Sequence, residues 1–180
     1  MLIAAPKVYA QSTKNNINSP IEYFNKRSIA LSLAKSQNWQ ELIPIAENLT
    51  QYYQKDGDLF YILGLSYYET QQYQKAITAL KNTLDLGGTN LVVPTGSHPS
   101  NDIMIKIAKA YALNGDKSNA MLWLQNGFTA RYDEKPFLKD DPAFEAFKQD
   151  EDFLLLFGND TQEEITREEA WAKDLDYLEK

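Results

Sequence analysis

The order of large, small and aromatic side chains in this chain of 180 residues repeats with a period of 34, and no other feature limits the possible fold as strongly. The three repeats are residues 23–56, 57–90 and 101–134. When the three repeats are aligned, each aligned position forms a column. A small residue stands in the same column of each repeat: Ala30, Gly64 and Ala108. A period of this length predicts helical hairpins that stack in a row, because one hairpin cannot bury its apolar face alone.

The middle repeat shows why its first half should be a helix. Phe60, Leu63, Gly64 and Tyr67 follow one another at i, i+3, i+4 and i+7, which places them on one face of a helix. Such a stripe is too narrow to form a core, so it has to pack against a second helix. Gly64 is expected to let the two helices of the hairpin approach closely. We therefore predict an all-α fold, an α-solenoid of three helical hairpins.

The middle repeat resembles the tetratricopeptide repeat (TPR) family. The matching residues are Phe60, Leu63, Gly64, Tyr67, Tyr73, Ala76 and Leu80. The repeat departs from the family's pattern at its end, where Gly88 replaces the usual proline and Thr83 a usual small apolar residue. The resemblance implies that the first helix of each hairpin lines a concave groove in which a partner binds.

Residues 135–158 are predicted to form two short helices that cap the last hairpin. Asp141 is placed to cap the first of them, and Pro142 fits its opening position. Aromatic side chains of this segment are expected to cover the exposed end of the array. The segment and the repeat before it resemble the ending of many bacterial TPR proteins, at these residues: Gly115, Asp116, Ala120, Trp123, Leu124, Leu138, Asp141, Pro142 and Phe144. The TPR-like domain is predicted to span residues 20–158.

Residues 1–19 are predicted to be a leader, with Ser19 as the first helix cap and Pro20 in the first turn of the folded domain. The stretch that ends at Ala10 fits the small-residue rule for cleavage by a signal peptidase, although Lys7 interrupts its apolar part. We interpret the leader as the remnant of an export signal, which implies a periplasmic or secreted protein. The alternative is an unstructured leader on a cytoplasmic protein.

Residues 159–180 are predicted to be an acidic linker followed by the start of a helix. Thr166 and Glu169 form a capping box, and Trp171 and Leu175 begin an apolar stripe. This run resembles the helix that opens the hydrolase portion of some bacterial secreted proteins similar to tail-specific serine proteases. The resemblance implies a fused downstream domain and an alternative function, in which the chain is the N-terminal helical region of a larger exported hydrolase and positions its substrate or catalytic domain.

Composition argues against catalysis and against several classes of partner. The chain has no cysteine and one histidine, so it offers no thiolate chemistry and little imidazole chemistry. The net charge of −7 opposes nucleic-acid binding; residues 140–180 hold 14 acids and 4 bases (−10), which leaves +3 on the first 139 residues. The longest apolar runs, such as residues 153–157, are far shorter than the roughly 18 residues of a membrane span. We predict no enzymatic activity, metal, cofactor or integral membrane segment.

Residues 91–100 interrupt the period between the second and third repeats. Two prolines and a glycine exclude a helix here, so the segment is predicted to be an ordered loop or a short extended segment beside the array. Loops of this kind can carry function. His98 has no paired acid or nucleophile nearby in the sequence, and we interpret it as a loop residue.

The predicted function is recognition of a protein or peptide in the groove lined by the first helices. By the TPR resemblance, the residues that would bind are Arg27, Lys35, Tyr61, Leu65, Tyr68, Glu69 and Lys109. Tyr61 and Tyr68 are candidate anchors for an extended peptide or a helix. Asp58 and Asp102 also stand in groove columns, and their charge opposes a carboxylate clamp for chaperone tails. The alternative is that these residues pack against the leader, the tail or a fused domain of the same polypeptide.

Overall fold

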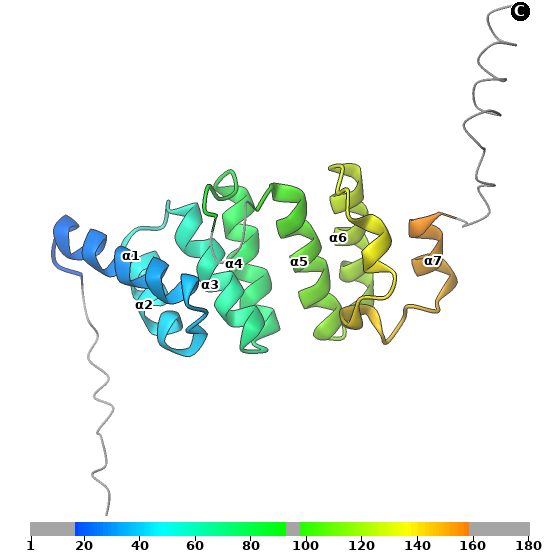
Figure 1. Cartoon of the computed structure of the whole chain (residues 1–180), viewed down its shortest axis with the longest axis horizontal. Helices are drawn as coiled ribbons and strands as arrows, with labels where there is room; N and C mark the ends of the chain where they lie inside the picture. The colour runs from blue at the N-terminus through cyan, green and yellow to red at the C-terminus, as the bar shows by residue number, and fades with distance from the viewer. Residues whose placement is uncertain (1–16, 93–97, 159–180) are drawn as a thin grey trace, which may run out of the picture. The chain divides into compact units, whose positions relative to one another are not determined.

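The computed structural model describes residues 17–92 and 98–158, and Figure 1 shows their helices. The chain divides into two compact units, Met1–Pro99 and Ser100–Lys180. The described residues form seven α-helices and two short 3-10 helices, without a strand. The prediction of an all-α fold is therefore confirmed. None of the helices in residues 17–92 and 98–158 combines the length and apolar character that crossing a membrane requires.

The first unit contains two helical hairpins that follow one another along the chain. Its helices are α1 (Pro20–Lys35), α2 (Trp39–Tyr52), α3 (Gly57–Glu69) and α4 (Tyr73–Asp85). Each helix packs against the next one, and α1 also contacts α3. The first helices of the two hairpins are therefore neighbours and present a common face.

Helix α1 begins at the predicted residues. The side chain of Ser19 accepts a hydrogen bond from the backbone N–H of Glu22 at 3.1 Å, and Pro20 occupies the first turn of α1. A proline fits this position because the first helical N–H groups have no partner within the helix. Residues 1–16 of the predicted leader and the linker and helix predicted at residues 159–180 lie outside the described residues.

The second unit contains the third hairpin and the segment that follows it. The hairpin is formed by α5 (Ser100–Leu113) and α6 (Lys117–Thr129). After it come η1 (Lys135–Leu138), η2 (Pro142–Phe144) and α7 (Glu151–Phe157). Helix α5 packs against both α6 and η2, so the segment after the hairpin folds back onto it.

A turn of one geometry joins the two helices of every hairpin. A residue with positive φ stands in the same column each time: Gln37 at 57°, Gln71 at 61° and Gly115 at 81°. One residue later, a backbone N–H donates to a carbonyl five residues back: Asn38 to Leu33 (2.9 Å), Gln72 to Tyr67 (2.7 Å) and Asp116 to Tyr111 (2.9 Å). The first two turns are 34 residues apart, and the third follows after 44, one period plus the ten-residue insertion. The period in the sequence thus corresponds to a recurring backbone turn.

Close approach of paired helices is confirmed at Gly64. A Cβ added there would lie 2.7 Å from the Cγ atom and 3.2 Å from the backbone nitrogen of Leu80, so α3 and α4 touch at this point. In the second unit, a Cβ on Gly127 would lie 2.6 Å from the Cδ1 atom of Ile105. Ala108, which stands in the column of Gly64, is completely buried. Small side chains therefore lie at helix contacts in both units.

The segment after the third hairpin is more tightly wound than predicted. Instead of a first α-helix, it contains the short 3-10 helices η1 and η2, and only α7 is an α-helix. The large buried side chains of the segment are separated by multiples of three, at Leu138, Phe144, Phe147 and Phe153, and the small Ala143 is buried beside Phe144. This spacing matches the three residues per turn of a 3-10 helix.

The predicted cap residue and the predicted aromatic packing are both present in this segment. The side chain of Asp141 accepts a hydrogen bond from the backbone N–H of Ala143 at 2.9 Å. The ring of Phe153 lies 5.5 Å from that of Phe144 and 4.9 Å from that of Phe157, measured between ring centroids. Aromatic packing thus supplies the core of a segment that has little regular helix.

Candidate functional site

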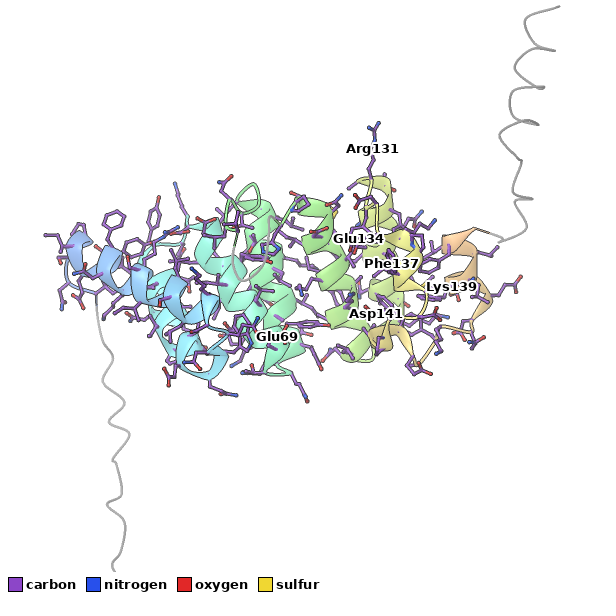
Figure 2. All side chains as sticks on the ribbon, in the orientation of Figure 1. Glu69, Arg131, Glu134, Phe137, Lys139 and Asp141 are labelled. Carbon is purple, nitrogen blue, oxygen red and sulfur yellow. The ribbon has the colours of Figure 1, made fainter. Side chains whose placement is uncertain are left out.

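Helices α1 and α3 carry six of the seven residues predicted to line a groove. Lys35 and Glu69 stand in the same column of their repeats and are exposed, and Figure 2 labels Glu69 near the end of α3. Tyr68 is partly exposed, and its ring meets that of Tyr73 edge-on at 5.9 Å. These residues lie where a partner of the first unit could reach them.

Two predicted groove residues are covered in this structure. Tyr61 is 2% exposed and Leu65 is 3% exposed, so neither side chain offers free surface. The ring of His98 lies over that of Tyr61, with centroids 4.8 Å apart and an angle of 31° between the planes. The predicted anchor Tyr61 is thus already in contact with another part of its own chain.

Arg27 joins α1 to the start of α3 instead of presenting a free charge. Its Nε atom lies 2.8 Å from Oδ2 of Asp56, and its Nη2 atom lies 2.8 Å from Oδ2 of Asp58. The hydroxyl of Tyr23 also donates to Asp56 at 2.8 Å. Asp56 caps α3 at the same time, because its Oδ1 atom accepts from the N–H of Leu59 at 3.2 Å. One carboxylate therefore orients two helices.

The ionisation of this cluster follows from its contacts. Burial alone would raise the pKa of Asp56, but the hydrogen bonds from Arg27 and Tyr23 outweigh it and hold the pKa below its ordinary value of 3.8. Burial, and then the hydrogen bond to Asp56, raise the pKa of the Tyr23 phenol. At neutral pH the carboxylate is therefore charged and the phenol is neutral.

The end of the middle repeat, after α4, contacts the same face of α3. The Oδ1 atom of Asp58 accepts a hydrogen bond from the hydroxyl of Thr89 at 2.7 Å and another from the N–H of Asn90 at 3.1 Å. His98, in the segment 91–100, lies over Tyr61, so residues that follow α4 contact two groove columns of the middle repeat. Residues 93–97 of the segment predicted to be an ordered loop lie outside the described residues. The sequence gives no sign that Thr89 and Asn90 would bind Asp58, because they lie more than 30 positions away.

Lys109, the predicted groove residue of the second unit, is paired. Its Nζ atom lies 2.6 Å from Oδ2 of Asp141, the residue that caps η2. Asp102 is half-buried, and its charge contributes to the raised pKa of about 12 at Tyr132, after burial and Glu134. The cation of Lys109 thus helps to hold η2 on α5.

Replacing Lys109 with methionine is expected to lower the stability of the second unit by less than about 1 kcal/mol, because both partners of the ion pair remain partly exposed. The measurement is thermal unfolding at low and at high salt. A larger loss, or a loss that salt does not reduce, would contradict a screened surface pair.

A depression in the surface of the first unit is lined by residues of α2, α3 and α4. It consists of two overlapping hollows of about 410 and 440 Å³ that share four lining residues: Thr50, Gln51, Phe60 and Asn82. The hydroxyl of Tyr67 donates to Glu47 at its edge, and Lys75 lies 5.1 Å from the centroid of the same ring. Burial, and then the bond to Glu47, raise the pKa of Tyr67. This depression was not predicted from the sequence. Most of its lining residues lie in the second helices of the hairpins, whereas all residues predicted to bind a partner lie in the first helices.

The arrangement contains no cluster suited to metal binding among residues 17–92 and 98–158. The chain matches no protein-family model and no curated protein sequence. The resemblance to TPR proteins therefore depends on the residues that carry it and on the recurring hairpin turn.

Proposed function

We propose that this chain is a non-catalytic interaction module, a helical-repeat protein similar to TPR proteins, that binds a protein segment on the face shared by α1 and α3. The observation that supports this proposal is the hairpin turn that recurs in the 34-residue phase, together with the contact between α1 and α3. Residues of one column in the two helices are thereby brought onto one surface. On that surface Lys35 and Glu69 are exposed.

The chemistry of this surface favours an amphipathic partner. Lys35 and Glu69 carry opposite charges at the ends of their helices, and Tyr68 adds an aromatic surface that is partly open. Aromatic side chains are frequent energetic anchors in interfaces, whereas exposed charges orient the partner. An extended peptide or a helix with an apolar centre and charged ends fits this surface. The net charge of −7 disfavours nucleic acid.

The proposal is tested by selecting peptides from a random display library on the whole chain and measuring the affinity of the selected peptide. Charge reversal in Lys35→Glu or Glu69→Lys is expected to weaken binding about two- to fivefold. Tyr68→Ala is expected to weaken it about five- to thirtyfold, because it removes an anchor. Each variant is checked for unchanged helix content by circular dichroism.

The matched control is Asp85→Lys, which reverses an exposed charge at the end of α4, a second helix. Its affinity for the selected peptide is expected to equal that of the unmodified chain. Undiminished binding in Lys35→Glu, Glu69→Lys and Tyr68→Ala together would move the site away from this face.

The alternative function as the front region of an exported hydrolase depends on residues 159–180, and export depends on residues 1–16. Both segments lie outside the described residues. No observation on residues 17–92 and 98–158 therefore favours the alternative over an interaction module.

A further inference from the structure

We propose that the depression lined by α2, α3 and α4 binds an extended segment of a partner protein through an arginine side chain and an apolar side chain three positions from it. The depression lies between residues of α2 and α4, the second helices, and over a stripe of α3 that carries no groove column. It is therefore a site apart from the face shared by α1 and α3, and the inference goes beyond the proposed function.

The first hollow of the depression, of about 410 Å³, presents hydrogen-bond acceptors. Asp85 is the last residue of α4, and it is exposed. Gln51 of α2 and Asn82 of α4 line the same hollow, and no hydrogen bond joins their carboxamide groups to another of residues 17–92 and 98–158. A guanidinium group has five N–H donors and no acceptor, so one carboxylate and two amide oxygens match it.

The ends of two helices add to the negative potential of this hollow. Gln54, two residues after α2, and Leu86, directly after α4, both line it. The C-terminal end of a helix carries a partial negative charge that favours a cation. Neither helix has a basic residue in its last turn, and the nearest lysines in the sequence, Lys55 and Lys81, do not line the hollow. A basic side chain of a partner therefore complements this end of the depression.

The ring of Phe60 favours arginine over lysine as that side chain. Phe60 is half-buried and lines both hollows, so part of its ring faces the depression. A planar guanidinium stacks on an aromatic ring and meets a carboxylate with two parallel hydrogen bonds, whereas an ammonium group is a compact and strongly hydrated charge. Phe60 and Asp85 together thus supply the two contacts that distinguish arginine from lysine.

The second hollow, of about 440 Å³, suits an apolar side chain. Leu63 and Ala79 line it and are buried, so they form its floor. At its edge the hydroxyl of Tyr67 donates to Glu47, and Lys75 lies 5.1 Å from the centroid of the same ring. These opposite charges are held at one ring and offset each other. The second hollow therefore does not require a charged side chain from the partner.

The length of the depression sets the distance between the two side chains of the partner. Thr78, in the second hollow, stands seven residues before Asp85 on α4, which corresponds to about 10 Å along the helix. An extended chain advances about 3.3 Å per residue, so about three residues cover this distance. An arginine in the first hollow thus places the residue three positions away over the second hollow.

The probe is a synthetic peptide with blocked ends, SLTSRTSLS, in which a leucine stands three positions before and three positions after the arginine. It therefore fits the depression in either chain direction. The peptide is titrated into the isotope-labelled whole chain, and NMR follows the side-chain amide signals of Gln51, Gln54 and Asn82. These signals are expected to shift with a dissociation constant of about 1 mM or below. The amide signal of Gln37, in the turn after α1, is expected to stay unchanged and serves as the control.

Variants of the peptide test the chemistry of each hollow. Citrulline in place of arginine keeps the shape and removes the charge, and it is expected to weaken binding at least about tenfold. Lysine is expected to weaken binding about three- to tenfold. Serine in place of both leucines is expected to weaken it about fivefold or more. Equal affinity of the arginine and citrulline peptides would overturn the guanidinium site, and equal affinity of the serine peptide would overturn the role of the second hollow.

A variant of the protein tests whether Asp85 meets the guanidinium. Asp85→Asn removes an exposed charge without changing the shape, and it is expected to weaken the arginine peptide about five- to tenfold while leaving the citrulline peptide unchanged. The matched control Glu41→Gln removes an exposed carboxylate of α2 outside the depression and is expected to keep the full preference for arginine. An equal loss for both peptides in Asp85→Asn would show that the carboxylate does not contact the arginine.

The outcomes separate this inference from the proposed function. If the arginine peptide leaves the amide signals of Gln51 and Asn82 unchanged at about 1 mM, the depression is not a peptide site. The proposed function survives that result when the display-selected peptide still depends on Tyr68. If the display-selected peptide instead keeps its affinity in Tyr68→Ala and loses it in Asp85→Lys, the depression is supported and the face shared by α1 and α3 is not the site.

Discussion

Replacing Asp56 with alanine is expected to lower the free energy of unfolding of the first unit by about 2 to 4 kcal/mol. The substitution removes the cap of α3 and the partner of both Arg27 and Tyr23. The side chains of Asp56 and Arg27 are only 12% and 25% exposed, so the guanidinium is left partly buried without one of its two carboxylates. Losing one member of such a pair costs more than losing a surface pair.

The measurement is urea unfolding followed by the fluorescence of Trp39, which lies in α2, in a background where Trp123 and Trp171 are replaced by phenylalanine. The control Asp85→Ala removes an exposed carboxylate from α4 and is expected to change stability by less than about 0.5 kcal/mol. A loss at Asp56 no larger than at Asp85 would show that the cluster does not hold α1 and α3 together.

The same carboxylate gives the stability of the first unit a defined pH dependence. Because the pKa of Asp56 is lower in the folded state than its ordinary value of 3.8, the unfolded chain takes up the proton first as the pH falls. The contribution of Asp56 is therefore complete well above pH 3.8 and disappears as the pH drops through the lowered pKa. The stability difference between the unmodified chain and Asp56→Asn should narrow below about pH 4. A constant difference from pH 7 to about pH 3 would exclude a lowered pKa.

The hairpins could be predicted from the sequence because their determinants are local and repeat. Gly64 and its column indicated a helix contact, and the structure places Leu80 there. Ser19 and Pro20 indicated the start of α1 through capping chemistry that needs only three or four neighbouring residues. Such signals depend on short-range spacing, which a sequence displays directly.

The surroundings of the groove columns could not be predicted in the same way. Arg27 and Tyr61 were assigned to a groove by their column alone, but ion pairs and ring contacts depend on residues about 30 to 40 positions away. The position of a residue within its repeat does not indicate its distant neighbours. It therefore could not indicate that Asp56 and Asp58 pair with Arg27, or that His98 covers Tyr61.

The 3-10 turns after the third hairpin are a different case. Leu138, Phe144 and Phe147 are six and three positions apart, a spacing that the sequence displays but that we interpreted as an α-helix.

Replacing Gly64 with leucine is expected to destabilise the first unit by about 1 to 3 kcal/mol, because the contact with α4 leaves no room for a large side chain. Even a Cβ atom would lie 2.7 and 2.8 Å from two side-chain carbons of Leu80 and 3.2 Å from its backbone nitrogen. The backbone of α4 cannot move aside as a flexible side chain can. Urea unfolding followed through Trp39 measures the loss.

The other hairpins show how much space each side chain at this contact needs. The residues in the columns of Gly64 and Leu80 are Ala30 and Ala46 in the first hairpin, and all four are buried. In the third hairpin the same columns hold Ala108 and Leu124, so an alanine can stand opposite a leucine. Gly64→Ala should therefore cost less than Gly64→Leu, because a gain of about 1 kcal/mol in helix propensity offsets part of the shift that the new Cβ imposes on Leu80.

A double-mutant cycle tests whether the side chains at positions 64 and 80 share one volume between α3 and α4. Leu80→Ala alone is expected to cost about 2 to 4 kcal/mol, because it opens a cavity at a fully buried position. In the Gly64→Leu background the same change makes room for the new side chain, so its cost should fall by at least about 1 kcal/mol. Additive effects would mean that the two residues do not share one volume. The close approach of α3 and α4 would then not be the reason why glycine occupies this column.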